Sequence, residues 1–176
     1  MFNIHSFFSP WIKTSAAVLI AMFVLVSCSN DSAESVASAQ SVAQMDLYKS
    51  PTCGCCGIWQ EHAQERGFAF TVHHRDNDEL TLEKLRLGIN LRYHSCHTAV
   101  AADGSVFEGH VPAYLIHQYL AAKPADSLGL AVPGMPLGSP GMEAGDRLDP
   151  YDVLLLKTDG STEVFASITN LQMQYQ

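Results

Sequence analysis

The apolar and polar positions of this chain change their period several times, which predicts a mixed α/β fold. Short strand-like runs lie at 45–52 and 68–74, where apolar side chains cluster or alternate with polar ones. Each run is followed by a segment with apolar residues three or four positions apart, at 57–67 and 77–89, which predicts an amphipathic helix. The chain therefore predicts strand, helix, strand and helix in that order.

Both predicted helices have an expected buried face. In the first helix, Ile58, His62 and Glu65 stand at helical spacing. In the second helix, Leu82, Leu85 and Ile89 share one face. We expect these faces to pack against the sheet.

A β-hairpin is predicted at 96–111, because two apolar runs flank the turn signal Asp103-Gly104. Pro112 then opens a predicted helix that ends before the next proline. The resulting order, βαβαββα, is that of thioredoxin-like domains, in which a cysteine motif lies between the first strand and the first helix. Cysteines stand in that place here.

The segment after this unit has a different composition. Residues 129–150 are rich in proline, glycine and methionine, which predicts a loop. A second hairpin is predicted at 151–167, with its turn at Asp159-Gly160. The fold class is therefore α/β, a thioredoxin-like βαβαββα domain with a C-terminal Pro/Gly/Met-rich loop and β-hairpin extension.

The N-terminal segment predicts export. The apolar stretch "SAAVLIAMFVLV" follows a single basic residue, Lys13, and is shorter than the ~20 residues of a spanning helix, as in a signal peptide. The next residues, "LVSC", resemble the lipobox of bacterial lipoproteins, which implies that Cys28 is lipidated and anchors the chain on the periplasmic side of the outer membrane. An ordinary signal peptide, or an uncleaved anchor with an incidental cysteine, is the alternative.

The sequence thus divides into four predicted parts. They are a lipoprotein signal peptide (1–27), a small, polar tether that begins at the lipidated Cys28 (28–44), the thioredoxin-like domain (45–167) and a C-terminal tail (168–176).

Composition and charge exclude several function classes. The chain has 10 Lys plus Arg against 18 Asp plus Glu, a net charge of −8, and no basic run that would attract a phosphate backbone, so we expect no nucleic-acid partner. It also lacks a Gly-rich phosphate loop, a nucleophilic serine elbow and a paired-carboxylate motif. The remaining candidate chemistry is that of the cysteines.

Four cysteines lie in the predicted domain: Cys53, Cys55 and Cys56 in "SPTCGCCGIW", and Cys96 in "YHSCHTAV". An even number in an exported chain could mean two disulfides. Geometry favours one, because only Cys53 and Cys56 form a C-x-x-C pair, whereas adjacent cysteines bridge only with strain. Cysteines in the first turn of a helix also meet unpaired N–H groups, which lower thiol pKa values and favour a nucleophile or a metal ligand.

Cys96 decides between these two uses. Thioredoxin-class oxidoreductases resemble one another in a cis-proline that faces the C-x-x-C pair, but this chain has no proline between Pro51 and Pro112. Ser95-Cys96-His97 stands at about that position and supplies a fourth soft ligand. Several thiolates prefer Cu(I), or Zn(II) as the alternative, and three crowded sulfurs suit bridging of more than one copper ion. The sequence therefore predicts a copper site, with thiol-disulfide exchange or a structural zinc module as the other hypotheses.

Four further residues are candidate secondary ligands. Met135 and Met142 lie in the predicted loop, and a thioether can bind Cu(I) without forming a disulfide. His97 adjoins Cys96, and His110 lies at the end of the hairpin opposite its turn, hence near Cys96. Each of the four also has a structural interpretation, as gap-filling methionine or hydrogen-bonded histidine.

Four motifs in order, "YKSPTCGCCGIW", "SCHTAV", "EGHVPA" and "GLAVPGMPLGSPGME", resemble the signatures of the CopG-type copper-resistance proteins. This family consists of small exported bacterial metal-binding proteins, formerly a conserved domain of unknown function. The resemblance implies a thioredoxin-like fold and a copper site made by Cys53, Cys55, Cys56 and Cys96. It further implies copper redox conversion or handover to other periplasmic copper-handling proteins, and leaves open whether the protein is a Cu(I)/Cu(II) oxidoreductase or a non-enzymatic binding protein.

Overall fold

The structure, a computed structural model, describes residues 43–176. Its seven strands are β1 (Ala43–Lys49), β2 (Phe68–His74), β3 (His97–Ala101), β4 (Val106–Gly109), β5 (Ser127–Val132), β6 (Tyr151–Lys157) and β7 (Thr162–Ile168). Its helices are α1 (Gly54–Gln64), α2 (Asn77–Arg86) and α3 (Ala113–Ala121), with 3-10 turns η1 (Leu91–Tyr93) and η2 (Leu171–Tyr175). No helix in this described part is long and apolar enough to cross a membrane. The predicted signal peptide, Cys28 and most of the tether lie outside the described residues.

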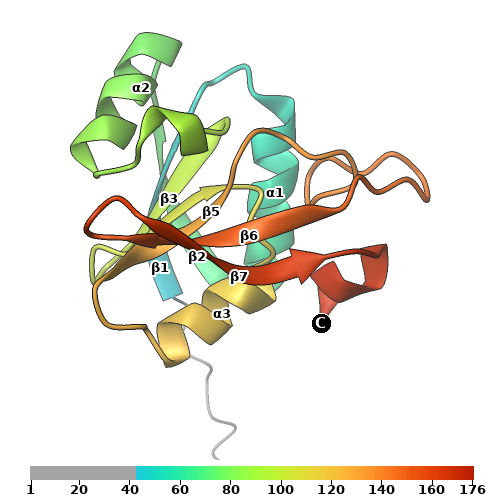
Figure 1. Cartoon of the computed structure of the whole chain (residues 1–176). Helices are drawn as coiled ribbons and strands as arrows, with labels where there is room; N and C mark the ends of the chain where they lie inside the picture. The colour runs from blue at the N-terminus through green and yellow to red at the C-terminus, as the bar shows by residue number, and fades with distance from the viewer. Residues whose placement is uncertain (1–42) are drawn as a thin grey trace, which may run out of the picture. The chain divides into compact units, whose positions relative to one another are not determined.

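All seven strands join one mixed sheet in the order β2-β1-β3-β4-β5-β6-β7 (Figure 1). The predicted order from β1 to α3 is confirmed, and so are both hairpin turns, at Gly104 and Gly160. The prediction of a loop from residue 129 was wrong at its start. Ser127–Val132 is strand β5, which pairs parallel to β4 after the crossover helix α3.

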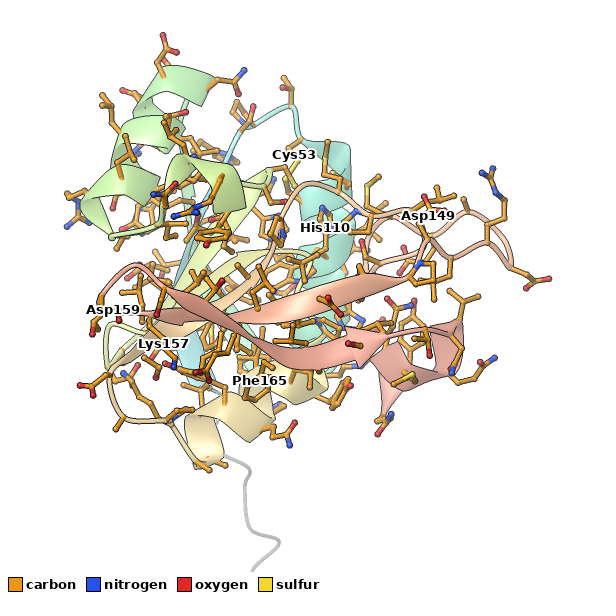
Figure 2. All side chains as sticks on the ribbon, viewed as in Figure 1. Cys53, His110, Asp149, Lys157, Asp159 and Phe165 are labelled. Atoms are coloured by element: carbon orange, nitrogen blue, oxygen red, sulfur yellow. A yellow bond between two sulfur atoms is a disulfide. The ribbon has the colours of Figure 1, made fainter. Side chains whose placement is uncertain are left out.

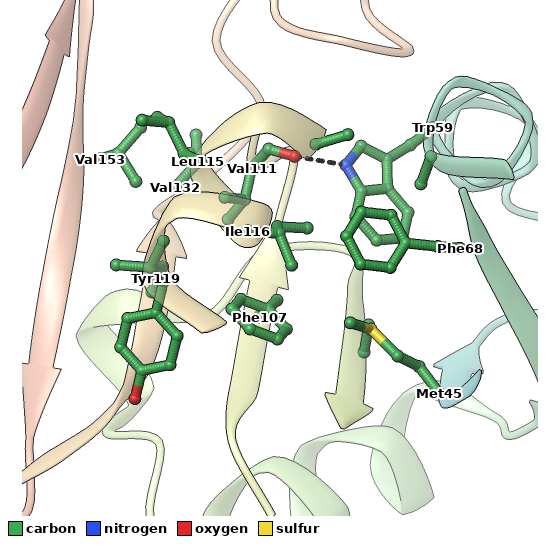
Figure 3. Packing of buried hydrophobic residues seen from close by; sticks show 14 of the residues in the cluster. Met45, Trp59, Phe68, Phe107, Val111, Leu115, Ile116, Tyr119, Val132 and Val153 are labelled. Atoms are coloured by element: carbon green, nitrogen blue, oxygen red, sulfur yellow. Dashed lines mark hydrogen bonds between the residues drawn. The ribbon is translucent and has the colours of Figure 1, made fainter. Parts of the chain in front are cut away.

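Helices cover both faces of the sheet. Helices α1 and α3 share the main core with one face, where Trp59, Phe107 and Tyr119 are fully buried (Figure 3). The segment from α2 to η1 covers the other face, where Ile89 packs with Val106. Side chains alternate across a strand, so neighbouring residues of β4 enter opposite cores.

The predicted faces of the first two helices were partly wrong. Ile58 is 52% exposed and Leu82 is 67% exposed, whereas Trp59 of α1 and Lys84 of α2 are buried. Apolar spacing alone predicts the wrong buried face for α2, because Lys84 points into the protein, where Glu108 pairs with its charge. Ile89 is buried as predicted.

The sheet topology brings three chain segments to one end of the sheet. Strand β1 ends at Lys49, opposite His97 at the start of antiparallel β3, and β4 ends at Gly109 beside that start. The cysteine motif that follows β1 therefore lies beside the residues that precede β3 and follow β4. Figure 2 shows Cys53 and His110 at this end and Asp159 at the far turn of the β6–β7 hairpin.

Candidate metal centre

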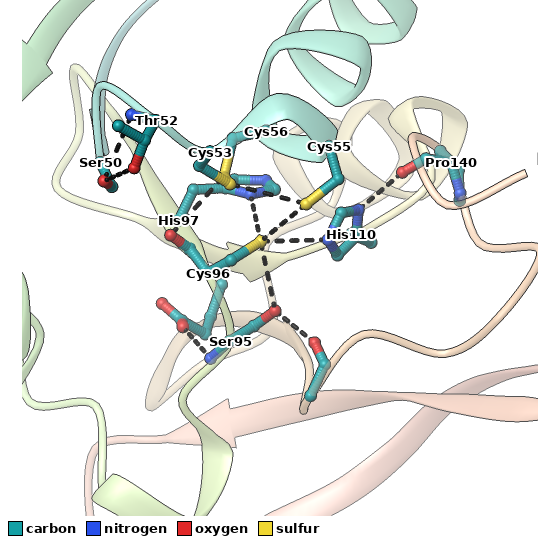
Figure 4. Close-up of a disulfide and its surroundings, with 12 residues drawn as sticks. Ser50, Thr52, Cys53, Cys55, Cys56, Ser95, Cys96, His97, His110 and Pro140 are labelled. Carbon is teal, nitrogen blue, oxygen red and sulfur yellow. Dashed lines mark hydrogen bonds between the residues drawn. A yellow bond between two sulfur atoms is a disulfide. The ribbon is translucent and has the colours of Figure 1, made fainter. Parts of the chain in front are cut away.

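Four sulfur atoms converge at this end of the sheet (Figure 4). The Sγ atoms of Cys53, Cys55, Cys56 and Cys96 all lie within 4.8 Å of one another. Cys55 Sγ is 3.5 Å from Cys53 Sγ and 3.9 Å from Cys96 Sγ. Helix α1 begins between these cysteines, at Gly54, so its first turn presents Cys55 and Cys56 toward the start of β3. The predicted convergence of Cys96 on the motif is thus present.

One disulfide joins Cys53 to Cys56, the pair favoured by spacing, and Cys55 and Cys96 are free thiols. Cys56 is fully buried, and its Sγ lies 3.7 Å from the backbone carbonyl oxygen of Cys96. A disulfide sulfur is not a thiolate ligand. The structure therefore describes the oxidised form of a site that gains two sulfur donors when the disulfide accepts two electrons and two protons.

Two histidines complete a second donor group around Cys96. Its Sγ is 3.1 Å from His110 Nε2 and 3.3 Å from His97 Nδ1, as the hairpin prediction expected for His110. Cys96, His97 and His110 satisfy the same 4.8 Å criterion as the four cysteines. Cys96 is the one residue common to both groups in the described part of the chain.

The surroundings keep these donors neutral in the absence of metal. Burial, and then the neighbouring Cys55, raises the pKa of Cys96 to about 12. Burial also lowers the pKa of His110, and that of His97 well below its ordinary value. A metal that binds the Cys96 sulfur must therefore displace a proton, whereas both imidazoles are already unprotonated at neutral pH.

Polar contacts fix His110 more fully than His97. His110 donates from Nδ1–H to the carbonyl oxygen of Pro140 at 2.7 Å, which leaves the lone pair of Nε2 directed at Cys96. His97 is fully buried against the Trp59 ring, with centroids 4.3 Å apart. Its Nε2 is the one buried side-chain nitrogen or oxygen without a hydrogen-bond partner among the described residues.

A buried ion pair supports the backbone just before Cys96. Lys84 Nζ lies 2.5 Å from Glu108 Oε1 and donates to the Ser95 carbonyl oxygen at 2.6 Å. The same Glu108 oxygen accepts from Ser95 N–H at 2.5 Å, and its other oxygen accepts from the Thr98 hydroxyl. Both backbone polar groups of Ser95 are thus held, by Lys84 of α2 and Glu108 of β4, which fixes the approach of Cys96 to the cluster.

The loop between β5 and β6, residues 133–150, folds against the site. Gly141 has φ +87°, and a Cβ there would come within 2.7 Å of the Cys55 carbonyl oxygen and 2.8 Å of the Trp59 backbone nitrogen. Only glycine allows this approach. Met135 is 53% exposed and Met142 is half-buried on this loop, and their role as ligands stays a prediction.

A cavity of about 400 Å³ opens on the other side of the cluster, toward α2. Cys53 and Cys96 line it together with Ser50, Asn77 and Thr81. The cluster is therefore covered by the loop on one side and can be reached on the other side through a polar opening.

The comparisons with known proteins agree with this geometry. Two solved structures named copper resistance protein CopG, forms 1 and 2, are 42% and 43% identical to the chain, with TM-scores of 0.67 and 0.66. Each match covers 98% of the solved chain, and they cover 73% and 72% of this one. The chain belongs to the CopG copper-resistance family. The CopG chains thus match this protein over nearly their whole length.

A family of unknown function, DUF411, matches residues 93–142. This range contains Cys96, His97 and His110 and begins after the other three cysteines of the site. No curated protein matches the chain. Membership of the CopG family, together with the cysteine cluster, makes the chain a copper-resistance homologue with a plausible metal site.

Sequence reasoning missed the residues that support the ligands. Glu108 carried a signal, because it is an acidic residue within the otherwise apolar run "VFEGHV". The sequence gives no sign that Lys84 is buried, since a lysine on an amphipathic helix is ordinarily exposed. His62 accepts from Ala113 N–H at 3.2 Å at the start of α3, and burial lowers the pKa of His62 to about 4.

Proposed function

We propose that this protein holds Cu(I) through Cys53, Cys55, Cys56 and Cys96 once the disulfide is reduced. Soft thiolates favour Cu(I) above other available ions, and a neutral imidazole is a suitable further ligand. The observation that carries the proposal is the position of Cys96, whose sulfur lies within 4.8 Å of both the other sulfurs and the two histidines. The sulfurs of the other three cysteines and the nitrogens of two histidines surround the Cys96 sulfur, and this number of donor atoms suits a site with several copper ions.

His97 and His110 are the secondary ligands that the geometry favours. Met135 and Met142 remain candidates on the loop that packs against Cys55. The CopG relatives support a role in copper resistance, by sequestration, by Cu(I)/Cu(II) cycling or by transfer to other copper-handling proteins. The element order and the parallel pairing of β1 with β2 support the thioredoxin-like interpretation of the predicted domain at 45–167.

Thiol-disulfide exchange is the second candidate function, because Cys53 and Cys56 form a disulfide beside an open cavity. A substrate dithiol would attack this disulfide, become oxidised to a disulfide itself and leave Cys53 and Cys56 as two thiols. This chemistry needs neither Cys96 nor a metal. A structural zinc site is the third candidate, and would make chelators unfold the domain.

Reduced protein should compete with bathocuproine disulfonate for Cu(I) under argon, whereas the disulfide form should bind less copper because two sulfurs are tied. Titration followed by the absorbance of the chelator complex, with thiols counted on the same sample, measures this. An equal concentration of Zn(II) should not displace the copper. Reduced protein that leaves all Cu(I) on the chelator, or exchanges it for zinc, would contradict the proposal.

We further propose that the protein is exported and anchored to the outer membrane through lipidated Cys28, as the "LVSC" motif supports. Cells fed a labelled fatty acid should then incorporate the label into the wild-type chain and not into a Cys28→Ser variant. Label in both chains, or in neither, would exclude the anchor. Such an anchor would place copper binding outside the cytoplasm.

A further inference from the structure

The C-terminal residues contact the loop that supports His110. This inference rests on the proposed copper function and concerns residues that touch neither the cysteines nor the histidines of the candidate site. The relevant loop segment is residues 138–143, called here the site loop. The relevant C-terminal residues are Gln174 and Tyr175 of η2, called here the latch.

The site loop determines which nitrogen of His110 is free. The Pro140 carbonyl oxygen can only accept, so the 2.7 Å contact places the proton on Nδ1. Nε2 then has a lone pair, 3.1 Å from Cys96 Sγ. If the Pro140 carbonyl moved away, the Nδ1–H group would lose its acceptor, and the proton would be free to occupy Nε2 instead.

Glu143 holds the site loop in its place against α1. Its Oε1 accepts from Gly141 N–H at 2.9 Å, directly beside Pro140. Gly141 in turn lies against the Cys55 carbonyl. Glu143 is exposed, so this contact is not a requirement of the core.

The latch secures the same loop from the C-terminus. Tyr175 donates from its hydroxyl to Glu143 Oε1 at 2.9 Å. Gln174 is fully buried, donates from Nε2 to the Gly138 carbonyl oxygen at 2.8 Å and accepts from the Tyr151 hydroxyl at 2.6 Å. A buried glutamine whose amide oxygen and nitrogen each have a hydrogen-bond partner indicates a specific contact rather than an incidental one.

The Tyr175 ring also contacts α1, the helix that carries the cysteines. The Arg66 guanidinium lies 5.5 Å from the ring centroid, and the His62 ring meets it edge-on at 5.6 Å. The latch therefore joins the end of α1 to the site loop.

We propose that Glu143, Gln174 and Tyr175 are positioning residues of the copper site. They keep the Pro140 carbonyl on His110 Nδ1–H, so that Nε2 stays available to bind copper beside Cys96. The Pro140 carbonyl oxygen is then an outer hydrogen-bond partner of a metal-binding histidine. Loss of such a partner lowers metal affinity about 10- to 100-fold.

The test uses Glu143→Ala and Tyr175→Phe in the full chain. Both remove contacts at exposed or half-exposed positions and spare the core. Long-range ¹H–¹⁵N NMR of the metal-free protein at pH 8 reports the His110 tautomer, and competition with bathocuproine disulfonate reports Cu(I) affinity. Both variants should shift His110 from the Nδ1–H form toward a mixture, and Glu143→Ala should lower Cu(I) affinity about ten-fold.

Tyr93→Phe is the matched control, because the Tyr93 hydroxyl contacts only Thr162, at 3.3 Å and away from the loop. It should leave both readouts at wild-type values. A tautomer and an affinity unchanged in Glu143→Ala would overturn the inference, and so would a changed tautomer with unchanged affinity. Wild-type protein that binds no Cu(I) would instead overturn the proposed function itself, whatever the tautomer shows.

Discussion

Replacing Cys96 with serine should lower the Cu(I) affinity of the reduced protein more than about 100-fold, beyond the loss expected for an outer partner alone. Serine has nearly the same shape, but its oxygen is a hard ligand that Cu(I) disfavours. Cys96 is also the one described residue shared by both donor groups, so its loss separates the sulfurs of α1 from the histidines. The copper stoichiometry in an anoxic titration should fall as well.

Cys28→Ser is the matched control for this substitution, because Cys28 is predicted to carry lipid and not metal. Its copper stoichiometry should equal that of the wild type. The Cys96→Ser variant also distinguishes the two leading functions. Unchanged copper binding in that variant would exclude Cys96 as a ligand, and metal-independent disulfide exchange at the wild-type rate would then favour the Cys53–Cys56 dithiol as the working chemistry.

Glu108→Ala should destabilise the fold by about 3–5 kcal/mol, because it leaves the Lys84 ammonium buried without a counter-charge. It also removes the acceptor of the Ser95 N–H, at 2.5 Å. Urea denaturation of the reduced, metal-free protein measures the free energy of unfolding. The folded fraction should bind Cu(I) more weakly as well, since Ser95 precedes the ligand Cys96.

Two further variants test whether the unpaired buried charge causes the loss of stability in Glu108→Ala. Glu163→Ala removes a strand glutamate that also pairs with a lysine, but its side chain is 61% exposed, so the loss should stay below about 1 kcal/mol. The double variant Lys84→Met with Glu108→Gln removes both charges and keeps an acceptor for Ser95. It should recover part of the lost stability. A double variant as unstable as Glu108→Ala would show that shape or hydrogen bonding, and not charge, dominates at this position.

The candidate ligands could be found from the sequence because they are local or nearly so. Cys53, Cys55 and Cys56 lie within one turn of chain, and the hairpin turn at Gly104 alone places Cys96 opposite His110. The strand and helix order was also predictable, since period-2 and period-3.6 patterns are set by backbone geometry. Family resemblance then agreed with these local patterns.

The pattern of residues is enough to identify which groups can bind a soft metal and the elements that carry them. Only the folded chain shows which helix faces are buried, that Ser127–Val132 adds a strand, and that Lys84 pairs with Glu108 inside the protein. It also shows that Gln174 and Tyr175 reach the loop over the site. The physical reason is that these contacts join residues far apart in the chain, and burial and ion pairing depend on the complete packed environment rather than on local periodicity.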